Sequence, residues 1–305
     1  MMSKGVRAWI EAARLRTLPL ALSSIIIGSA LAAFDGAFNV HVLILAALTA
    51  VFLQILSNLA NDYGDAVKGT DNAGRVGPVR AVQSGTITPA LMGKGIAATA
   101  VVAVCMGMWL ICAGLRGLSW LYYVSFVLLG LVSVAAALTY TLGRKPYGYS
   151  GFGDVSVFLF FGQAGVLGAY FLHRHELSWG AALMASVLGL FSMGVLNLNN
   201  MRDMENDQRC GKITIAVRLG LARAKIYHAF LIAAGLLGAA FFTVLYFISA
   251  KQLLIFLIFP VFLRDVHAIL NTRENSELDS FLKKLSLTTF IFSILFGAGL
   301  ILSLC

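Results

Sequence analysis

The stretch NLANDYGDAVKGTD, residues 58–71, brings three carboxylates and two amides to the end of a long apolar run. Asn58, Asn61 and Asp65 stand at positions i, i+3 and i+7, so a helix that continues through them carries all three on one face. Carboxylate and amide oxygens suit Mg²⁺ or Ca²⁺, whereas His and Cys, the usual zinc ligands, are absent from the stretch. The stretch therefore predicts a site for a hard cation, and a magnesium ion there would hold a phosphate.

The apolar run before residue 58 is one of several that decide the class of the protein. The chain of 305 residues is 59% hydrophobic and 12% charged, and its mean hydropathy is +0.85. Soluble proteins carry roughly 25% charged residues. Apolar runs of about 18 to 25 residues, long enough to cross a hydrocarbon core of roughly 30 Å as helices, recur throughout. The sequence predicts an all-α, polytopic membrane protein in which residues 1–305 form a single domain.

The apolar runs predict a bundle of about nine transmembrane helices with a defined orientation. They lie at residues 17–34, 41–60, 95–115, 119–141, 154–172, 179–198, 227–249, 252–271 and 286–304. With a cytoplasmic N-terminus, the external connections hold only Arg116, Arg174 and Lys251 of the 23 Lys and Arg residues. Basic residues concentrate on the cytoplasmic side of membrane proteins. We therefore expect a multi-pass protein of the cell (inner) membrane whose N-terminus and active site are cytoplasmic.

The formal charge of +9 accordingly belongs to one face of the protein. That face could meet the anionic head groups of membrane lipid or an anionic substrate. Nucleic acid is not expected as a partner, because the basic residues stand singly in short loops and are not interleaved with aromatic residues.

A second polar stretch, NLNNMRDMENDQRCGKIT at residues 197–214, follows the sixth span and repeats the spacing of the first. Asn200, Asp203 and Asp207 again stand at i, i+3 and i+7. Both stretches follow even-numbered spans, so they reach the same face of the membrane and can converge. Facing rows of carboxylates repel in a site shielded from water, which favours the binding of divalent cations. One row alone could be an ordinary helix end or a solvated loop, but two rows on one face predict a metal site.

Basic and aromatic residues near the two stretches offer partners for a phosphate and for an aromatic ring. The polar loop 72–94 is long for a membrane bundle and could act as a lid. Its segment GPVRAVQSG holds Arg80, which is either solvated or bound to phosphate. The stretch TYTLGRKPYGY, residues 139–149, is either an interfacial anchor or a pocket in which Arg144 or Lys145 meets phosphate and a tyrosine meets an aromatic substrate.

These groups together favour chemistry on a diphosphate whose organic part is apolar. Diphosphate bound to Mg²⁺ and to basic side chains is a good leaving group, because the charge that develops on it is stabilised. If the organic part is an isoprenoid chain, it belongs in lipid and between helices, which explains a polar site at the end of an apolar bundle. The allylic cation formed by ionisation needs an aromatic-lined, water-poor pocket, and the 21 Phe and 9 Tyr residues permit one.

The paired motifs resemble those of the UbiA superfamily of intramembrane prenyltransferases. The resemblance rests on NDYGDAVKGTD and NNMRDMENDQRCGKIT, on the second and sixth of the nine expected spans. It is closest to the branch that acts on 1,4-dihydroxy-2-naphthoate, through RLRTLPLAL, GPVRAVQSG and TYTLGRKPYGYSGFGDVSVF. It implies a Mg²⁺-dependent transfer of a polyprenyl group from polyprenyl diphosphate to the naphthoate ring. The ring carboxylate is lost as CO₂ and diphosphate is released, a step of menaquinone biosynthesis.

The resemblance also implies which motif residues bind metal. Asn61 and Asp65 match the first two positions of the superfamily pattern NxxxDxxxD. Asp203 and Asp207 match the DxxxD of the second motif. At the third position of the first pattern this sequence has a glycine, and the carboxylate is displaced to Asp71.

The expected site has four groups of residues. The catalytic residues are Asp65, Asp203 and Asp207, and the metal ligands are Asn61, Asp65, Asp71, Asp203 and Asp207. The diphosphate is expected to contact Lys68, Arg80, Arg144, Lys145 and Lys212. The aromatic acceptor is expected to contact Tyr140, Tyr147 and Asn200. A dedicated general base is not needed, because a reaction that ends by decarboxylation removes no ring proton at the attacked carbon.

Other functions share parts of this pattern. Prenylation of 4-hydroxybenzoate, for ubiquinone, would use the same machinery. An ion-coupled secondary transporter could hold its ion with Asp and Asn, but such sites lie at the membrane midplane in broken helices, whereas both rows here lie at helix ends. A CDP-alcohol phosphotransferase also uses carboxylates and Mg²⁺, but its DG-x-x-AR type of stretch is missing. The length of the prenyl chain depends on how deep a channel runs between the helices.

Overall fold

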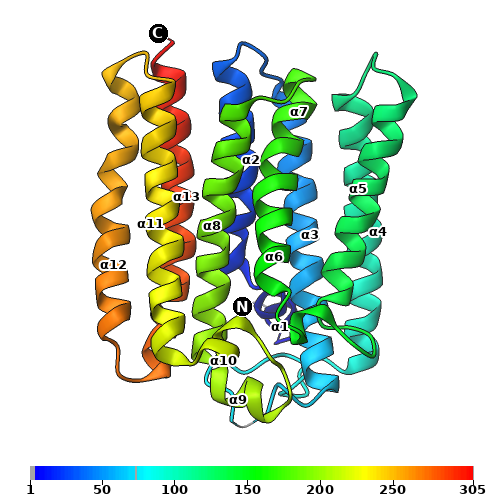
Figure 1. The fold of residues 1–305 in the computed structure, drawn as a ribbon. Coiled ribbons are helices and arrows are strands. Elements are labelled where there is room, and N and C mark those ends of the chain that lie inside the picture. Colours follow the sequence, from blue (N-terminus) through cyan, green and yellow to red (C-terminus); the bar gives the residue numbers. More distant parts are fainter. Residues whose placement is uncertain (1–3, 73, 305) are drawn as a thin grey trace.

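The regular elements are helices throughout the residues that the computed structural model describes, 4–72 and 74–304. Within these ranges, nine helical segments are long and apolar enough to cross a membrane (Figure 1). The all-α fold and the number of spans predicted from the sequence are therefore confirmed.

The spans are single helices or composite ones. The single helices are α3 (Val40–Val67), α4 (Pro89–Gly114), α5 (Trp120–Thr139), α8 (Trp179–Arg202) and α11 (Leu221–Leu245). The first span is composite and runs from α1 (Lys4–Ala13) through η1 (Leu15–Thr17) into α2 (Leu18–Phe34), and the last runs from η5 (Asn275–Glu277) into α13 (Leu278–Leu302). Two further composite spans join α6 (Gly153–Val157), the π-helix η3 (Phe158–Leu167) and α7 (Gly168–Arg174), and the 3₁₀-helix η4 (Ala250–Ile258) and α12 (Phe259–Asn271). The short elements outside the spans are η2 (Tyr147–Tyr149), α9 (Met204–Arg209) and α10 (Ile215–Leu219).

The two helices that carry the polar stretches run further than their apolar residues predict. α3 ends at Val67 and α8 at Arg202, whereas the predicted spans end at residues 60 and 198. The helices continue because their polar side chains find partners on neighbouring segments. The amide nitrogen of Asn58, for example, donates to the hydroxyl of Thr17 at 2.9 Å.

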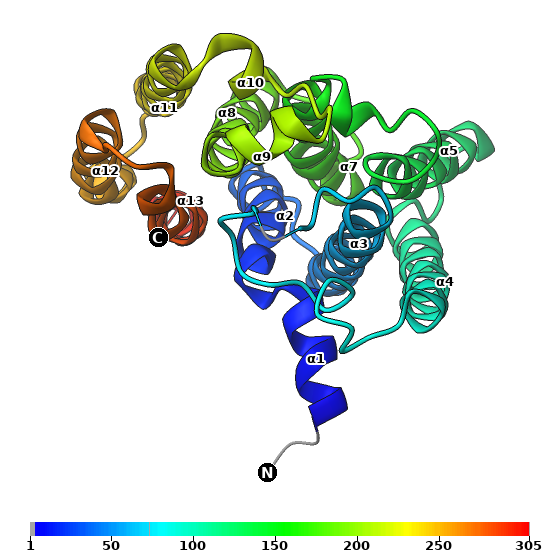
Figure 2. The same cartoon turned by 90° about the horizontal axis from the view of Figure 1, so that it is seen from below.

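An apolar core fills one side of the bundle. α2 runs through the middle of the molecule and contacts α3, α7, α8 and α13 (Figure 2). In the core that α8, α11, α12 and α13 share, the ring centroid of Phe191 lies 4.7 Å from that of Phe262 and 5.1 Å from that of Phe292. Each such aromatic pair contributes about 0.5–1.5 kcal/mol beyond the area that it buries. This half of the bundle is therefore a rigid support for α2 and α8.

The other side of the bundle, formed by α4 and α5, is packed less tightly. α5 contacts α3 and α4, and none of its residues is fully buried. A cavity lies between α2, α3, α4, α5 and η3. α5 therefore has one face toward this cavity and another toward lipid.

Both polar stretches lie at the same end of the bundle, at the bottom of Figure 1, as the sequence predicts. Arg116 follows α4, Arg174 ends α7 and Lys251 lies in η4, so all three belong to the opposite end. The charge is thus segregated between the two ends as expected. That the motif-bearing end faces the cytoplasm stays a prediction.

Candidate active site

Each polar stretch ends its helix in the same way. Two residues after the end of α3 stands Gly69, whose φ is 74°, and the N–H of Thr70 donates to the carbonyl of Asp65 at 2.9 Å. Two residues after the end of α9 stands Gly211, whose φ is 72°, and the N–H of Lys212 donates to the carbonyl of Asp207 at 2.8 Å. These are Schellman ends, which favour glycine because L side chains rarely adopt positive φ. Asp65 and Asp207 therefore lie in the last turn of a helix, where the negative end of the helix dipole favours a nearby cation.

The second row of oxygen ligands, unlike the first, is not one helical face. α8 ends at Arg202, and Asp203 forms the junction between α8 and α9. Asp203 and Asp207 line the cavity, whereas Asn200, also buried, is not among the residues that line it. The assignment of Asn200 to the aromatic acceptor therefore stays a prediction that this arrangement does not support.

The cavity has a volume of about 380 Å³, and its polar end is formed by the two stretches. Its polar lining includes Asn61, Asp65, Asp71, Arg75, Arg80, Asp203, Asp207 and Lys212. From Asn61 it extends along α3 as far as Ala46, a distance of about 22 Å at the rise of an α-helix. The site is thus a charged chamber at the end of a long apolar space.

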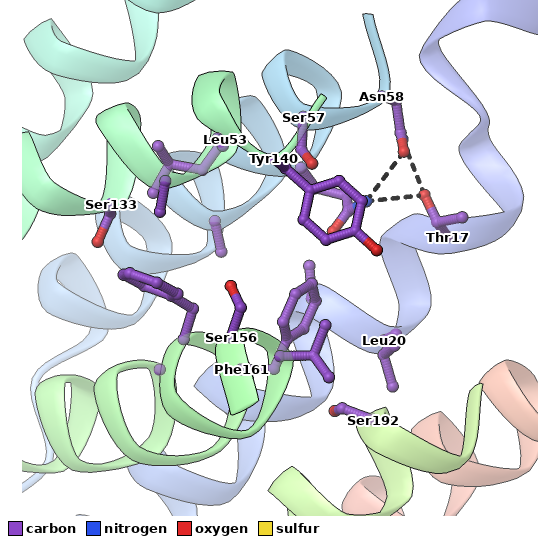
Figure 3. Close-up of a pocket in the computed structure, with 18 of the residues that line it drawn as sticks. Thr17, Leu20, Leu53, Ser57, Asn58, Ser133, Tyr140, Ser156, Phe161 and Ser192 are labelled. Carbon is purple, nitrogen blue, oxygen red and sulfur yellow. Dashed lines mark hydrogen bonds between the residues drawn. The ribbon is translucent and has the colours of Figure 1, made fainter. Parts of the chain in front are cut away.

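Aromatic rings and hydroxyl groups surround the cavity just beyond the charged chamber (Figure 3). The rings of Tyr140 and Tyr147 meet edge to face with centroids 5.3 Å apart. The hydroxyl of Tyr147 donates to the carbonyl of Ala136 at 2.9 Å and lies 2.9 Å from the hydroxyl of Ser156. Phe161 of the π-helix η3 also lines this part. Both predicted tyrosines therefore contribute to one aromatic wall.

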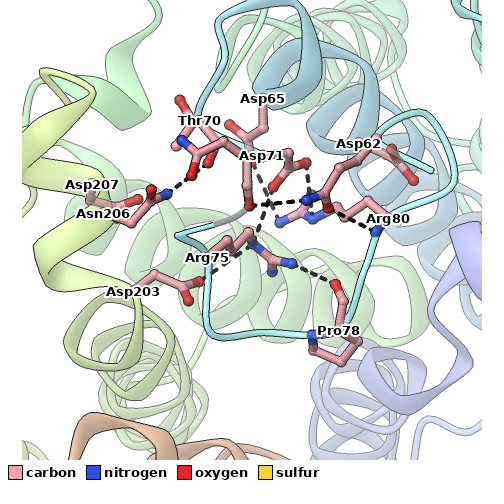
Figure 4. A network of polar contacts seen from close by, with 12 residues as sticks. Asp62, Asp65, Thr70, Asp71, Arg75, Pro78, Arg80, Asp203, Asn206 and Asp207 are labelled. Carbon is pink, nitrogen blue, oxygen red and sulfur yellow. Dashed lines mark hydrogen bonds and ion pairs between the residues drawn. The ribbon is translucent and has the colours of Figure 1, made fainter. Parts of the chain in front are cut away.

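Two arginines lie between the acidic side chains (Figure 4). Nε of Arg75 is 3.1 Å from Oδ1 of Asp71 and 3.8 Å from Oδ2 of Asp203. Nε of Arg80 is 3.3 Å from Oδ2 of Asp71, and its Nη2 is 3.5 Å from Oδ2 of Asp65. All five side chains are buried.

The second stretch also holds its carboxylates with its own cations. Nη2 of Arg202 lies 2.6 Å from Oδ2 of Asp203, and Nζ of Lys212 lies 3.3 Å from Oδ2 of Asp207. Arg202 additionally pairs with Asp279 of α13. The cations therefore balance much of the negative charge in the chamber.

Burial controls the ionisation of the carboxyl groups outside the membrane-spanning segments. Burial, and then the neighbouring Asp65, raises the pKa of Asp71 to about 7, although two arginines lie beside it. The loss of hydration thus outweighs the attraction of ion pairs. Burial also raises the pKa of Asp207 to about 6. Burial opposes the ionisation of Asp203 as well, but the hydrogen bonds from Arg202 outweigh it and lower the pKa of Asp203.

The donor set of the chamber fits magnesium. Both carboxylate oxygens of Asp71 and Oδ2 of Asp207 are buried without a hydrogen-bond donor among the described residues. No group of three or more Asp, Glu, His or Cys side chains in ranges 4–72 and 74–304 is close enough to hold one ion. Proteins usually bind Mg²⁺ through one or two carboxylates plus substrate phosphates, so the buried free oxygens of Asp71 and Asp207 suit this ion.

The predicted diphosphate ligands divide into two groups. Arg80 and Lys212 are buried beside the carboxylates and line the cavity. Lys68 is partly exposed, with Nζ 5.7 Å from the ring centroid of Tyr149. Arg144 and Lys145 are exposed on the loop after α5, and neither is among the residues lining the cavity. Contacts of the last three residues with diphosphate stay predictions.

Arg75 and Tyr149 also belong to the site, although no motif in the sequence points to either of them. Arg75 stands four residues after Asp71, but this spacing indicates a contact only on a helix, and both residues lie in a loop. The hydroxyl of Tyr149 donates to Oδ1 of Asp65 at 2.8 Å, and nothing in the local sequence indicates this contact across 84 positions.

Comparison with known proteins places this fold and site in a family. The UbiA prenyltransferase family model matches residues 21–298. The 1,4-dihydroxy-2-naphthoate octaprenyltransferase of Escherichia coli (strain K12) is 40% identical over 297 residues, which cover 97% of this chain and 96% of that protein.

Two solved structures share the fold. A UbiA homologue from Aeropyrum pernix K1, in its apo form, superposes with a TM-score of 0.68 at 18% identity and covers 96% of this chain and 99% of its own. A UbiA homologue from Archaeoglobus fulgidus, bound to DMAPP and Mg²⁺, superposes with a TM-score of 0.59 at 15% identity and the same coverage. The chain therefore belongs to the UbiA prenyltransferase family.

Proposed function

We propose that this protein transfers a polyprenyl group from polyprenyl diphosphate to 1,4-dihydroxy-2-naphthoate, with loss of the ring carboxylate as CO₂ and release of diphosphate. The proposal rests on one observation: the charged chamber opens into a long cavity that has an aromatic wall. The Escherichia coli relative is named for this acceptor and for an octaprenyl group. The family relationship and the helix-end position of both acidic motifs favour this activity over ion-coupled transport.

The charged chamber would bind the diphosphate. Asn61 with Asp65, and Asp203 with Asp207, would hold Mg²⁺, and Asp71 lies between these pairs in the ion-pair network. Mg²⁺, when bound, neutralises charge on the diphosphate and makes it a better leaving group. Arg80 and Lys212 would contact the remaining diphosphate oxygens, because they are the buried cations of the predicted set.

The long cavity would take the prenyl chain and protect the reacting carbon. Breaking the bond between this carbon and the diphosphate oxygen leaves an allylic cation. The rings of Tyr140 and Tyr147, at the join between chamber and cavity, would stabilise the cation through their faces. The apolar lining would keep water, which would capture the cation, away from it.

The naphthoate acceptor would lie against the same aromatic wall. A ring carbon attacks the allylic carbon, and the new carbon–carbon bond forms where the carboxylate is attached. Breaking the bond to the carboxylate returns its electron pair to the ring and releases CO₂. No proton leaves the attacked carbon, so the chamber needs no general base there.

Substitution of the carboxylates tests the proposal. In membranes supplied with polyprenyl diphosphate, dihydroxynaphthoate and Mg²⁺, Asp65→Asn and Asp203→Asn should each lower the rate of transfer by at least about 100-fold, because charge stabilisation of the leaving group is lost. Glu205→Gln is the matched control, since this carboxylate lies in α9 between the two motif aspartates but is exposed. Full activity of both aspartate variants would contradict the site assignment.

The acceptor is tested by the mass of the product. Purified protein given dihydroxynaphthoate should form a product that has gained the prenyl group and lost CO₂. The same protein given 4-hydroxybenzoate should form little product. A preference for 4-hydroxybenzoate would overturn the proposed acceptor while leaving the prenyl donor in place.

A further inference from the structure

The loop between α3 and α4 crosses the mouth of the charged chamber and inserts two arginines among the carboxylates (Figure 4). Arg75 connects the motifs, because its guanidinium lies within 4 Å of Asp71 from the first stretch and Asp203 from the second. Among the ion pairs of the described residues, it is the one side chain that bridges the two stretches. Arg80 connects Asp65 to Asp71 within the first stretch.

The arginines lie where carboxylates would otherwise repel one another. Asp65, Asp71, Asp203 and Asp207 are all buried at one end of the cavity. Like charges in a region with little water repel strongly. A guanidinium between two carboxylates removes this repulsion, which is also what a divalent cation would do there.

The ion pairs around Asp71 lack the geometry of good hydrogen bonds, so the arginines can exchange Asp71 for another partner. Neither oxygen of Asp71 receives a hydrogen bond of good geometry from Arg75 or Arg80, although both guanidinium groups are close. Nη1 of Arg80 is buried and has no hydrogen-bond partner among the residues that the structure describes. The arrangement thus leaves both a donor and two acceptors ready for other partners.

The backbone of the loop is held by contacts that do not involve the ion pairs. The carboxylate of Asp62 accepts the N–H groups of Ala81 and Val82 at 3.2 and 3.1 Å. The side-chain amide of Gln83 donates to the carbonyl of Asn72 at 3.0 Å. Nη1 of Arg75 also donates to the carbonyl of Pro78 at 2.6 Å, so Arg75 keeps one bond to the loop while its Nε, which faces the carboxylates, can change partners. The guanidinium of Arg80 can change partners while Asp62 and Gln83 hold the loop.

We propose that Arg75 and Arg80 are built-in counter-ions that hold the two acidic stretches together until Mg²⁺ binds, and that they then turn to the diphosphate oxygens. This rests on the proposed Mg²⁺ and diphosphate site. It adds an order of events, in which the same two guanidinium groups first compensate the carboxylates and then bind the substrate. Guanidinium suits both tasks, because its planar fork matches carboxylate and phosphate alike.

Two consequences distinguish counter-ions from arginines that only bind substrate. Without Arg75 the metal-free protein should be less stable, because the two stretches repel each other across the chamber. Mg²⁺ should then bind more tightly, since no guanidinium has to be displaced. An arginine that contacts only the diphosphate would change neither property in the absence of substrate.

Thermal unfolding of the purified full-length protein at pH 8, without substrate, tests the proposal. In EDTA, the Tm of Arg75→Gln should lie at least about 3 °C below that of the wild type. On titration with MgCl₂, half of the Tm increase should occur at a concentration at least about threefold lower than in the wild type. Arg223→Gln, which removes an exposed arginine of α11 outside the cavity, is the matched control and should behave as the wild type.

Further variants separate a bridge from a general effect of charge. Arg75→Lys keeps the charge but lacks the planar fork, so its Tm in EDTA should fall toward that of Arg75→Gln. If Arg75→Gln does not fold, the same Tm measurements on Arg75→Lys and Arg80→Gln test the proposal. The proposal is overturned if these variants match Arg223→Gln in both the metal-free Tm and the Mg²⁺ titration.

The exchange of partners is tested by kinetics at saturating Mg²⁺. Arg75→Gln and Arg80→Gln should each raise the KM for polyprenyl diphosphate by at least about tenfold and leave the KM for the aromatic acceptor unchanged. An unchanged KM for polyprenyl diphosphate would overturn the proposal that the arginines turn from the carboxylates to the diphosphate. If the wild type transfers the prenyl group but the arginine variants show the same Tm behaviour as the control variant, only the counter-ion proposal is overturned. Absence of transfer by the wild type would instead overturn the proposed function, while the Tm titration would still test the counter-ions.

Discussion

At the scale of single residues, Tyr149 joins the two motifs through separate atoms. Its carbonyl accepts the N–H of Ile213 at 2.9 Å, beside Lys212 of the second stretch. Its hydroxyl donates to Oδ1 of Asp65 at 2.8 Å and, because its own proton is used there, accepts from the hydroxyl of Thr70 at 2.7 Å. Tyr149 therefore orients Asp65 and leaves the other oxygen of this carboxylate facing Arg80. It is a positioning residue for the proposed metal ligand.

Removal of this hydroxyl should weaken Mg²⁺ binding. Tyr149→Phe loses one hydrogen bond to a carboxylate, worth about 1.5–3 kcal/mol, so the Mg²⁺ concentration for half-maximal activity should rise by about tenfold or more. The measurement is a Mg²⁺ titration of prenyl transfer, with Tyr122→Phe as the control because Tyr122 is exposed near the start of α5, at the opposite end of the bundle. Equal Mg²⁺ requirements in the two variants would exclude this role for Tyr149.

The sequence predicts the positions of some of these residues but not of others. The motif spacing predicts that Asp65, Asp203 and Asp207 gather at one end, and they do line one cavity. Contacts between separate segments set the places of Arg75 and Tyr149. The carboxylate of Asp62 accepts N–H groups from the loop that carries Arg75, and the N–H of Ile213 donates to the carbonyl of Tyr149. Periodicity carries no information about such contacts, so they could not be predicted from it.

At the scale of elements, the glycine ends of α3 and α9 fix the direction of the acidic turns. Gly211→Ala would force an L side chain into the φ of 72° and should destabilise the protein by about 1–2 kcal/mol. The Tm should fall by about 2–4 °C for each kcal/mol, and activity should fall with it. Gly93→Ala in α4 is the control, because a Cβ there meets open space and the helical φ is ordinary. A Tm unchanged by Gly211→Ala would show that the turn does not depend on glycine.

The elements that the sequence predicted least well are those that depart from a regular α-helix. The fifth span contains the π-helix η3, and the hydroxyl of Ser24 donates to the carbonyl of Phe161 within it at 2.7 Å. Hydropathy places an apolar run here but does not distinguish an α-helix from a π-helix, whose hydrogen bonds join residues i and i+5. The break at Asp203 escapes prediction for a similar reason, because α9 resumes the helix one residue later.

At the scale of the whole molecule, the cavity should decide which prenyl chains the protein accepts. Gly107 of α4 lines the cavity far from the charged chamber, whereas Val101 of the same helix is 63% exposed. Gly107→Trp should block the distal part and lower transfer of long prenyl groups by about tenfold or more while sparing short ones. Val101→Trp is the control. Mass spectrometry of products from a mixture of prenyl diphosphates measures both, and an equal loss for all lengths would contradict a role in chain-length selection.

Hydropathy and charge predicted the number and direction of the spans better than the details of single helices and side-chain contacts. Nine spans, with both acidic stretches at one end, follow from helix length and from the parity of the spans, which leave few alternatives for a chain in a bilayer. The depth of the cavity did not follow from these rules, because it depends on how far α5 stands from its neighbours.

Because α5 is loosely packed, the surrounding lipid should influence the shape of the cavity. None of the residues of α5 is fully buried, so acyl chains would contact its outer face while α3 and α4 contact its inner one. Bilayer thickness and lateral pressure would then set how wide the prenyl channel stands. The affinity for a long isoprenoid would be a joint property of the polypeptide and its membrane, and the same chain would bind it differently in a detergent micelle.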